Sequence, residues 1–203
     1  MARDISPVCK KCRREGEKLF LKGQKCLTEK CPLSKRGGKK SSFYSRRMST
    51  YSLQLKEKQK VKLVYGILEA QFKKFFKQAA KKGNTAIELI ILLERRLDNV
   101  VYRLQWATSR KQARQIVRHG HISVNGKKVD IPSFIVKSGD SIEFIDKESA
   151  YFKAIKDDIR KDNVVSWMQL EDNTKAQILR IPSEEDIKDF PYNTQMIVEL
   201  YSK

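Results

Sequence analysis

The chain has 203 residues, of which 40% are hydrophobic and 33% are charged, and its 43 Lys and Arg outnumber 24 Asp and Glu. This length allows one sizeable domain or two small ones. The formal net charge of +19 repels itself in a compact chain unless a polyanion neutralises it, and nucleic acid is the usual polyanion. An anionic membrane is the alternative. No stretch approaches the roughly 20 apolar residues that span a bilayer, so we expect no membrane partner.

The charge is spread unevenly along the chain. Residues 1–48 carry +11 and residues 49–146 carry +10, whereas residues 147–203 carry −2. We therefore expect RNA contacts in the first two segments, and protein packing or protein partners for the last. The N-terminal sequence Met1-Ala2-Arg3-Asp4 has no apolar signal core. This predicts no export and a reducing cytoplasm, where clustered cysteines are metal ligands and not disulfides.

All four cysteines lie near the start, in the pattern C-x2-C, thirteen residues, then C-x4-C. Each close pair can wrap a turn around one ion, and the loop between the pairs can complete a tetrahedral site. So short a segment buries too little apolar surface to fold alone, and a metal would supply the missing stability. We predict zinc as the cofactor, with an iron–sulfur cluster as the alternative. The predicted ligands are Cys9, Cys12, Cys26 and Cys31.

Basic side chains surround the cysteines and continue beyond them. Residues 35–45 are rich in Gly, Ser and Lys, which is typical of a flexible linker that becomes ordered on a phosphate surface. A solvated loop without contacts is the alternative. The predicted RNA-binding residues of this segment are Lys10, Lys11, Arg13, Arg14, Lys22, Lys35, Arg36, Lys39, Lys40, Arg46 and Arg47.

From residue 48 to residue 82, apolar residues recur at steps of three and four, which predicts helices with a break at Gly66. Another helix is predicted to begin near Thr85 as its N-cap, with Glu88 three residues later. These apolar stripes indicate a core. Among the polar residues between them, Lys58 and Lys62 are further candidates for RNA binding.

Between residues 109 and 144 the period of the pattern changes. Ser109 and Gln112 predict a capping box at the start of a short helix that ends at Gly120. Asn125-Gly126, between apolar residues, predicts a tight hairpin turn, and a further strand is expected over residues 142–144. Residues 149–161 have helical spacing, and the segment beyond them shows no clear pattern.

The predicted helix after Ser109 carries a row of arginines at four-residue spacing. Such a row repels itself at each step, and phosphate is the natural compensation. A solvated charged face is the alternative. The two histidines nearby lack a cysteine or acidic partner, so hydrogen bonds to RNA or a turn position suit them better than metal binding. The predicted RNA-binding residues here are Arg96, Arg103, Ser109, Arg110, Lys111, Arg114, Gln115, Arg118, His119, His121, Asn125, Lys127 and Lys128.

Several of these segments resemble a known family. RLDNVVYRL at 96–104, VRHGH at 117–121 and VNGKKVDIP at 124–132 strongly resemble the RNA-binding module of the bacterial small-subunit ribosomal protein S-four family. CRREG at 12–16 and QLKEKQK at 54–60 are similar to the N-terminal region of the same family. The resemblance covers nearly the whole chain and is least distinctive after Asp172. Within the family, the chain resembles the members that keep a cysteine knuckle.

The resemblance implies an α+β fold. It consists of a mostly helical first domain with an N-terminal metal knuckle, plus an inserted small α/β RNA-binding module of the S-four type. The implied boundaries are 1–48 for the cysteine metal knuckle and basic linker, 49–94 for the helical region, 95–158 for the module, and 159–203 for a C-terminal segment that packs back on the helical region.

The resemblance also implies a function. The protein would be a structural constituent of the small ribosomal subunit in the cytoplasm, and a primary binder of small-subunit ribosomal RNA. It would nucleate subunit assembly and contribute to translational accuracy. The implied partners are this RNA, ribosomal protein S-five, and messenger RNA near its entrance. No homo-oligomer is expected.

An enzyme and a DNA-binding regulator are the two alternatives to an RNA-binding protein. The same module occurs in pseudouridine synthases and tyrosyl-tRNA synthetases, but these need a separate catalytic domain. The sequence has no Rossmann glycine fingerprint, Walker loop or zinc-protease helix, so we expect no enzyme. A DNA-binding regulator would favour a helix-turn-helix or a zinc finger with histidine ligands, whereas the basic helix is rich in phosphate-type contacts.

Overall fold

The computed structural model describes residues 6–35, 49–146, 148–153, 164–188 and 190–202. The chain forms two compact units. Unit 1 comprises residues 1–88 and 191–203, and unit 2 comprises residues 89–190. A helical unit and a unit with a small antiparallel sheet make an α+β fold, as predicted. Within the described ranges, no helix is both long enough and apolar enough to cross a membrane.

The N-terminal part of unit 1 is built from three short helical segments. α1 ends at Gly16, whose positive φ of 77° lets its N–H donate to the carbonyl of Cys12, an arrangement that favours glycine. Leu19 is buried behind this turn. The segments are α1 (Val8–Glu15), η1 (Gly23–Cys26) and α2 (Pro32–Lys35).

The remaining helices of unit 1 follow the predicted apolar pattern. The break at Gly66 is confirmed, because its φ of 62° ends one helix three residues before the next begins. The predicted cap at Thr85 is wrong: the side chain of Asn84 accepts the N–H of Ile87, and Thr85 is the first helical residue. These helices are α3 (Thr50–Val64), α4 (Glu69–Ala79) and α5 (Thr85–Glu94), the last of which ends in unit 2.

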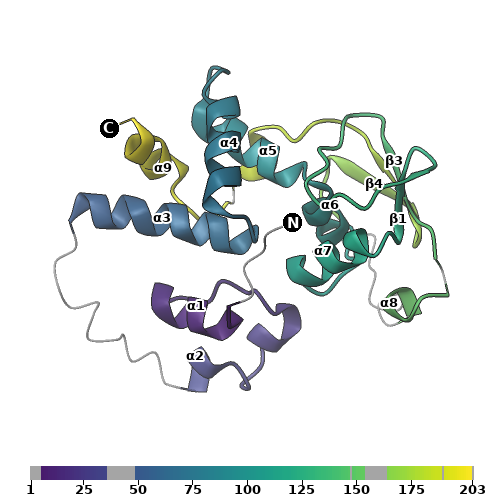
Figure 1. Ribbon diagram of the computed structural model, residues 1–203, viewed down its shortest axis with the longest axis horizontal. Coiled ribbons are helices and arrows are strands. Elements are labelled where there is room, and N and C mark those ends of the chain that lie inside the picture. The colour runs from purple at the N-terminus through teal and green to yellow at the C-terminus, as the bar shows by residue number, and fades with distance from the viewer. Residues whose placement is uncertain (1–5, 36–48, 147, 154–163, 189, 203) are drawn as a thin grey trace. The chain divides into compact units, whose positions relative to one another are not determined.

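The C-terminal helix α9 (Thr194–Tyr201) returns to α3 and α4 within unit 1 (Figure 1). Ile197 is fully buried. Tyr201 stacks on Phe76 with ring centroids 4.3 Å apart, and the Gln54 amide donates to Glu199 over 2.8 Å. Residues more than 120 positions apart in the sequence therefore share one core.

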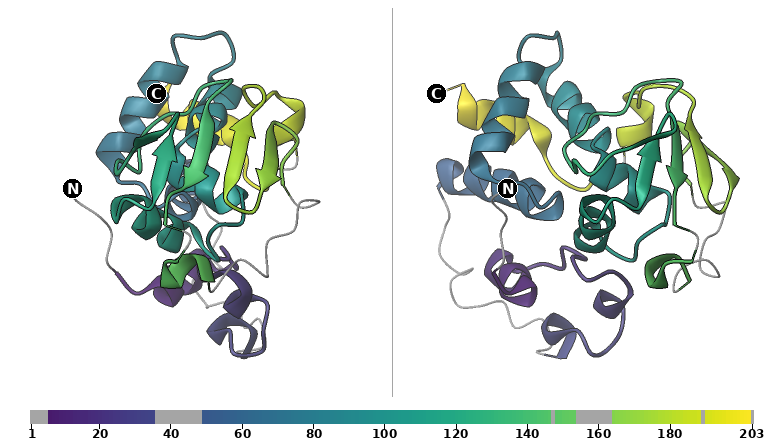
Figure 2. Two further views of the ribbon diagram at one scale, coloured as in Figure 1. Left: turned by 90° about the vertical axis from the view of Figure 1, so that its right-hand side faces the viewer. Right: turned by 45° about the vertical axis from the view of Figure 1, so that its right-hand side comes forward.

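In unit 2, helices α6 (Leu97–Arg103) and α7 (Arg110–Arg118) pack on one face of an antiparallel sheet of strand order β2-β1-β3-β5-β4 (Figure 2). The core between these layers is apolar, with Trp106 set edge-on against Phe144 at 6.0 Å. The strands are β1 (Ile122–Val124), β2 (Lys127–Lys128), β3 (Ser141–Phe144), β4 (Met168–Asp172) and β5 (Lys175–Ile178).

The predicted hairpin and third strand are confirmed. Asn125 and Gly126 both have positive φ, 51° and 75°, as a tight turn of this kind requires. Val124 pairs with Lys127 across the turn and with Ile142 of β3 on the other side. The turn therefore fixes the register that places the apolar side chains of β1 and β3 against the helices.

The C-terminal segment differs from the prediction. Residues 159–203 were expected to pack on the helical region, but β4 and β5 extend the sheet of unit 2, with Ile142 of β3 paired to Ala176 of β5. Pairing with β3 provides hydrogen-bond partners for the backbone of β5, and the side chains of Ala176 and Ile178 in β5 are buried. Of the described residues between 159 and 203, only 191–202 belong to unit 1. Of the helix predicted over 149–161, the structure describes α8 (Ala150–Lys153), and residues 154–163 lie outside the described ones. A 3-10 turn η5 (Glu185–Ile187) follows β5.

Candidate nucleic-acid interface

Helix α7 begins with the predicted cap. The Ser109 hydroxyl accepts the N–H of Gln112 at 3.4 Å. The second half of the capping box is shifted by one residue, since the Gln112 side-chain oxygen accepts from both the N–H and the hydroxyl of Thr108. Ala113, Ile116 and Val117 are fully buried, so the opposite face of the helix is turned outward.

The middle arginine of the row is anchored from α6. Arg114 donates to the Asp98 carboxylate over 3.1 Å, and the same carboxylate receives two hydrogen bonds from Arg96, at 2.9 and 3.1 Å. Arg96 is 0% exposed and Arg114 is half-buried. The predicted row of cations is therefore partly compensated within the protein, by a carboxylate that lies outside the helix.

The first arginine of the row is held by uncharged groups. Arg110 donates to the Asn99 side-chain oxygen over 2.8 Å, and its guanidinium lies 4.5 Å from the ring centre of Tyr102. Asn99 is itself held by the buried carboxylate of Glu94, which also receives two hydrogen bonds of 2.9 Å from Arg103. This chain of contacts fixes where the Arg110 side chain lies.

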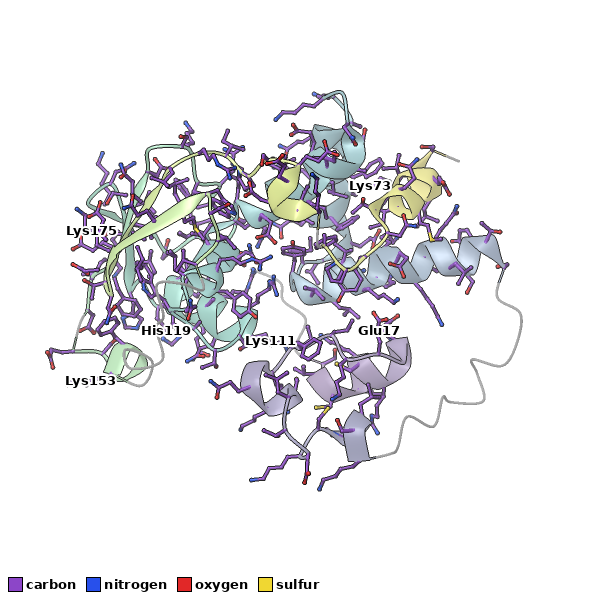
Figure 3. The ribbon with its side chains drawn as sticks, turned by 180° about the vertical axis from the view of Figure 1, so that it is seen from behind. Glu17, Lys73, Lys111, His119, Lys153 and Lys175 are labelled. Carbon is purple, nitrogen blue, oxygen red and sulfur yellow. The ribbon has the colours of Figure 1, made fainter. Side chains whose placement is uncertain are left out.

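The rest of the outward face of α7 is exposed. Lys111 and His119 lie near the two ends of the helix (Figure 3), and Gln115 and Arg118 lie between them. His121 is half-buried, with its Nδ1 atom 3.8 Å from a carboxylate oxygen of Asp146. Among the described residues, Arg118 has no ion-pair partner.

The hairpin extends this face. The side chain of Lys128 crosses Gly120 and occupies the space that a Cβ there would need. The end of this lysine side chain is flexible and could move aside, so it is the φ of 76° that favours glycine at this point. Lys127 and Lys128 are exposed and, like Arg118, have no ion-pair partner in the described ranges. We call Arg110, Lys111, Arg114, Gln115, Arg118, His119, Lys127 and Lys128 the α7 surface.

Several predicted RNA-binding residues make contacts that stabilise the fold. Arg96 is buried on Asp98, and Arg103 is paired with the buried Glu94. Asn125 bridges the hairpin to β3, since its side chain bonds both Asp140 and the N–H of Ser141. Lys58 is buried and Lys62 is half-buried, and both bond Glu69 at 2.8 Å. The pattern of charges alone does not separate such residues from surface cations.

The N-terminal candidates are mostly at the surface. Lys11 is buried, and Arg14 lies 3.6 Å from Glu15. The exposed ones are Lys10, Arg13, Arg14, Lys22 and Lys35. Arg36, Lys39, Lys40, Arg46 and Arg47 lie outside the described residues.

The four cysteines occupy three neighbouring segments of unit 1. Cys9 and Cys12 lie one turn apart on α1, Cys26 ends η1, and Cys31 precedes α2. All four are thiols without a disulfide. Burial raises the pKa of Cys12, and the other three sulfurs add to the rise because they lie within electrostatic range of it. Within the described ranges, however, no three His, Cys, Asp or Glu side chains are grouped closely enough to hold an ion. The donor set suits a thiolate-bound metal, whereas the distances do not show one.

Comparison with known proteins identifies two family domains in the chain. Residues 3–94 match the ribosomal protein S4/S9 N-terminal domain, and residues 95–142 match the S4 domain. The small ribosomal subunit protein uS4 of Dictyoglomus thermophilum is 48% identical over 207 residues, and that of Thermoanaerobacter sp. is 49% identical over 208. Both alignments cover all of this chain and all of the relative. The chain belongs to the bacterial ribosomal protein S4 family.

Sequence reasoning missed four residues that shape the α7 surface of this family member. Glu94, Asp98, Asn99 and Tyr102 hold its arginines, yet they were assigned no role. One signal was available. Asp98 and Asn99 are polar residues between Leu97 and the apolar pair Val100-Val101, where burial requires a partner.

Proposed function

We propose that the chain is a structural component of the small ribosomal subunit, in the cytoplasm, that binds small-subunit ribosomal RNA and has no catalytic activity. The observation that carries this proposal is the α7 surface, where arginines are held in place from behind by Asp98 and Asn99. Full-length relatives that are 48–49% identical and are named small ribosomal subunit proteins support it.

The α7 surface suits phosphate groups. Arginine and lysine supply charge-assisted hydrogen bonds to phosphate oxygens, and such contacts position a protein on folded RNA. An arginine that is already fixed by Asp98 or Asn99 loses less side-chain entropy when a phosphate binds. The sheet and α6 therefore act as a rigid support for the cations, and no nucleophile or general base is required.

The family resemblance extends this proposal to a role and to neighbours. An early, primary contact with small-subunit RNA would nucleate assembly, and a position near the entrance for messenger RNA, beside ribosomal protein S-five, would contribute to accuracy. The uneven charge of the chain supports such a place, because its net positive charge lies in the first 146 positions and the remainder is slightly acidic.

For the N-terminal segment we propose a structural zinc ion held by Cys9, Cys12, Cys26 and Cys31, with an iron–sulfur cluster as the alternative. Four thiols in three short segments with few buried apolar residues support it. When bound, the ion would supply a cross-link between these segments and no reaction chemistry.

RNA binding is tested by reversing two exposed charges of the α7 surface, Arg118→Glu with Lys127→Glu. Neither cation has an ion-pair partner among the described residues, so the fold should persist. The matched control is Lys137→Glu with Lys188→Glu, which changes the net charge equally at exposed positions elsewhere in unit 2. At about 100 mM salt, the first variant should bind a small-subunit RNA fragment roughly 10- to 100-fold more weakly, and the control much less so.

The same assay separates RNA binding from DNA binding. The wild-type chain should prefer folded small-subunit RNA over duplex DNA of equal length in direct competition. A preference for the duplex, or equal losses for both charge-reversal variants, would contradict the proposal.

A further inference from the structure

Helix α4 carries a row of lysines that the α7 surface does not include. Lys73, Lys77 and Lys81 follow one another at four-residue steps, with Lys74 beside them, and all four are exposed. Together with Ala70 and Gln78, they form one shallow, open surface on this helix and the turn after it. Lys73 is labelled in Figure 3. We call Lys73, Lys74, Lys77 and Lys81 the α4 stripe.

Within the described part of the chain, the α4 stripe has no carboxylate partner. Glu69 is the one acidic residue of α4 and lies four positions before Lys73, the favourable spacing for an ion pair. Its oxygens are instead occupied by Lys58, Lys62 and the hydroxyl of Tyr201. The contrast with α3 is clear, since Lys60 of that helix reaches both Glu57 and Glu17, at 2.8 and 3.1 Å.

The helix dipole does not account for the stripe. Cations near a helix C-terminus are stabilised by it, which suits Lys77 and Lys81. Lys73 and Lys74 lie in the middle of α4, beyond the last turn in which that effect acts. Like charges four residues apart also destabilise a helix by a few tenths of a kcal/mol per pair. An external anion is the remaining source of compensation.

The chemistry of the stripe favours a phosphate backbone over an acidic protein. Lysine is depleted in the cores of protein interfaces, which rely on aromatic and apolar anchors. Here the apolar side of α4, with Phe72, Phe75 and Ala79, is already buried in unit 1. Flexible, strongly hydrated ammonium groups bind phosphate as point charges and need no precise geometry.

We infer that the α4 stripe is a second RNA-binding surface, which contacts the phosphate backbone of ribosomal RNA independently of the α7 surface. The inference rests on the proposed RNA-binding function. It assigns to unit 1 a phosphate contact made by an ordered helix, in addition to the candidates of the N-terminal segment.

The test uses the full chain with Lys73→Gln, Lys77→Gln and Lys81→Gln. The matched control is Lys137→Gln, Lys153→Gln and Lys188→Gln, which removes the same charge from exposed positions of unit 2. RNA affinity is measured from about 50 to 200 mM salt. Each lost phosphate contact lowers the slope of log K against log salt by about 0.7–0.9, so the stripe variant should lose about 2 in slope and the control almost none.

A direct readout accompanies the affinity series. The lysines of the stripe should be acylated by an amine-reactive reagent more slowly when RNA is bound, as measured by mass spectrometry of the wild-type chain. An unchanged slope, or an equal loss in the control, would overturn the inference and leave the stripe to an acidic protein partner. If the wild-type chain does not prefer small-subunit RNA at all, the proposed function itself fails, and this is seen in the same series before any variant is compared.

Discussion

The carboxylate of Asp98 holds a buried arginine and a surface arginine at once. Arg96 has no exposed surface, so its charge must be neutralised inside the protein, and Asp98 does this with two hydrogen bonds. The third bond, to Arg114, then ties the position of a surface cation to the core. One residue thus serves both stability and the α7 surface.

Asp98→Asn should therefore lower the free energy of unfolding by about 3 kcal/mol, because it leaves Arg96 buried without a counter-charge. Urea unfolding should show a lower midpoint with an unchanged slope. Asp130→Asn is the control, since Asp130 is exposed in the loop after β2. Equal midpoints for the two variants would mean that Asp98 does not neutralise Arg96.

The stability of unit 1 should depend on pH through the side chain of Glu69. Partial burial alone would raise the pKa of Glu69, but hydrogen bonds from Lys58, Lys62 and Tyr201 outweigh it and lower the pKa to about 2. The unfolded chain, with a pKa near 4.5, takes up the proton first. The stabilisation by Glu69 is therefore complete above about pH 4.5 and is lost as the pH falls toward 2.

We expect wild-type unfolding midpoints to fall more steeply than those of Glu69→Gln between about pH 4.5 and pH 2. Because the Glu69 side chain is 46% exposed, solvent screening should keep the difference at about 1 kcal/mol or less. Exposed Glu29→Gln is the control and should follow the wild-type curve. Parallel curves for wild type and Glu69→Gln would remove this role.

At the level of residues, the sequence predicted the cations of the α7 surface but not their anchors. The four-residue spacing of Arg110, Arg114 and Arg118 is a local property and survives in the structure. The contact between Arg114 and Asp98 joins residues 16 positions apart and exists only once α6 and α7 have packed together. The role of Arg96 was missed for the same reason, since burial depends on tertiary packing.

Among the helices and strands, those with strong local signals were predicted and the short late strands were not. The turn at Asn125-Gly126 and the left-handed glycine at 120 are specified by backbone chemistry alone. β4 and β5 have five and four residues. The register of β4 also shifts between Leu170 and Asp172, which breaks the two-residue alternation that identifies a strand. Only the pairing of β5 with β3, and of β4 with β5, defines these two strands.

Helix α9 should stabilise the other helices of unit 1. Ile197 is fully buried against the helices of unit 1, so Ile197→Ala should cost about 3 kcal/mol through lost burial and the cavity left behind. Amide hydrogen exchange should quicken in α3, α4 and α9. The exposed neighbour Gln195→Ala is the control on the same helix. If α3 and α4 keep their protection in Ile197→Ala, the helix does not stabilise them.

Across the whole molecule, unit 2 and the cysteine segment of unit 1 differ in their sources of stability. Unit 2 has an extended apolar core beneath its sheet, whereas the segment from α1 to α2 has few buried apolar side chains, among them Leu19 and Cys26. A segment with so little apolar burial needs another source of stability, which is why the proposed zinc matters for the N-terminal region alone.

Removal of the proposed metal should therefore act locally. With a strong chelator, amide exchange should quicken over residues 8–35, while the strands of unit 2 keep their protection, since their stability comes from apolar burial and backbone pairing. Cys12→Ser should show the same pattern without chelator and respond no further when chelator is added. A chelator that changes exchange nowhere, or equally in both units, would show that no ion stabilises the cysteine segment specifically. If the chelator acts only on residues 8–35, metal analysis of the untreated protein should find one zinc ion per chain.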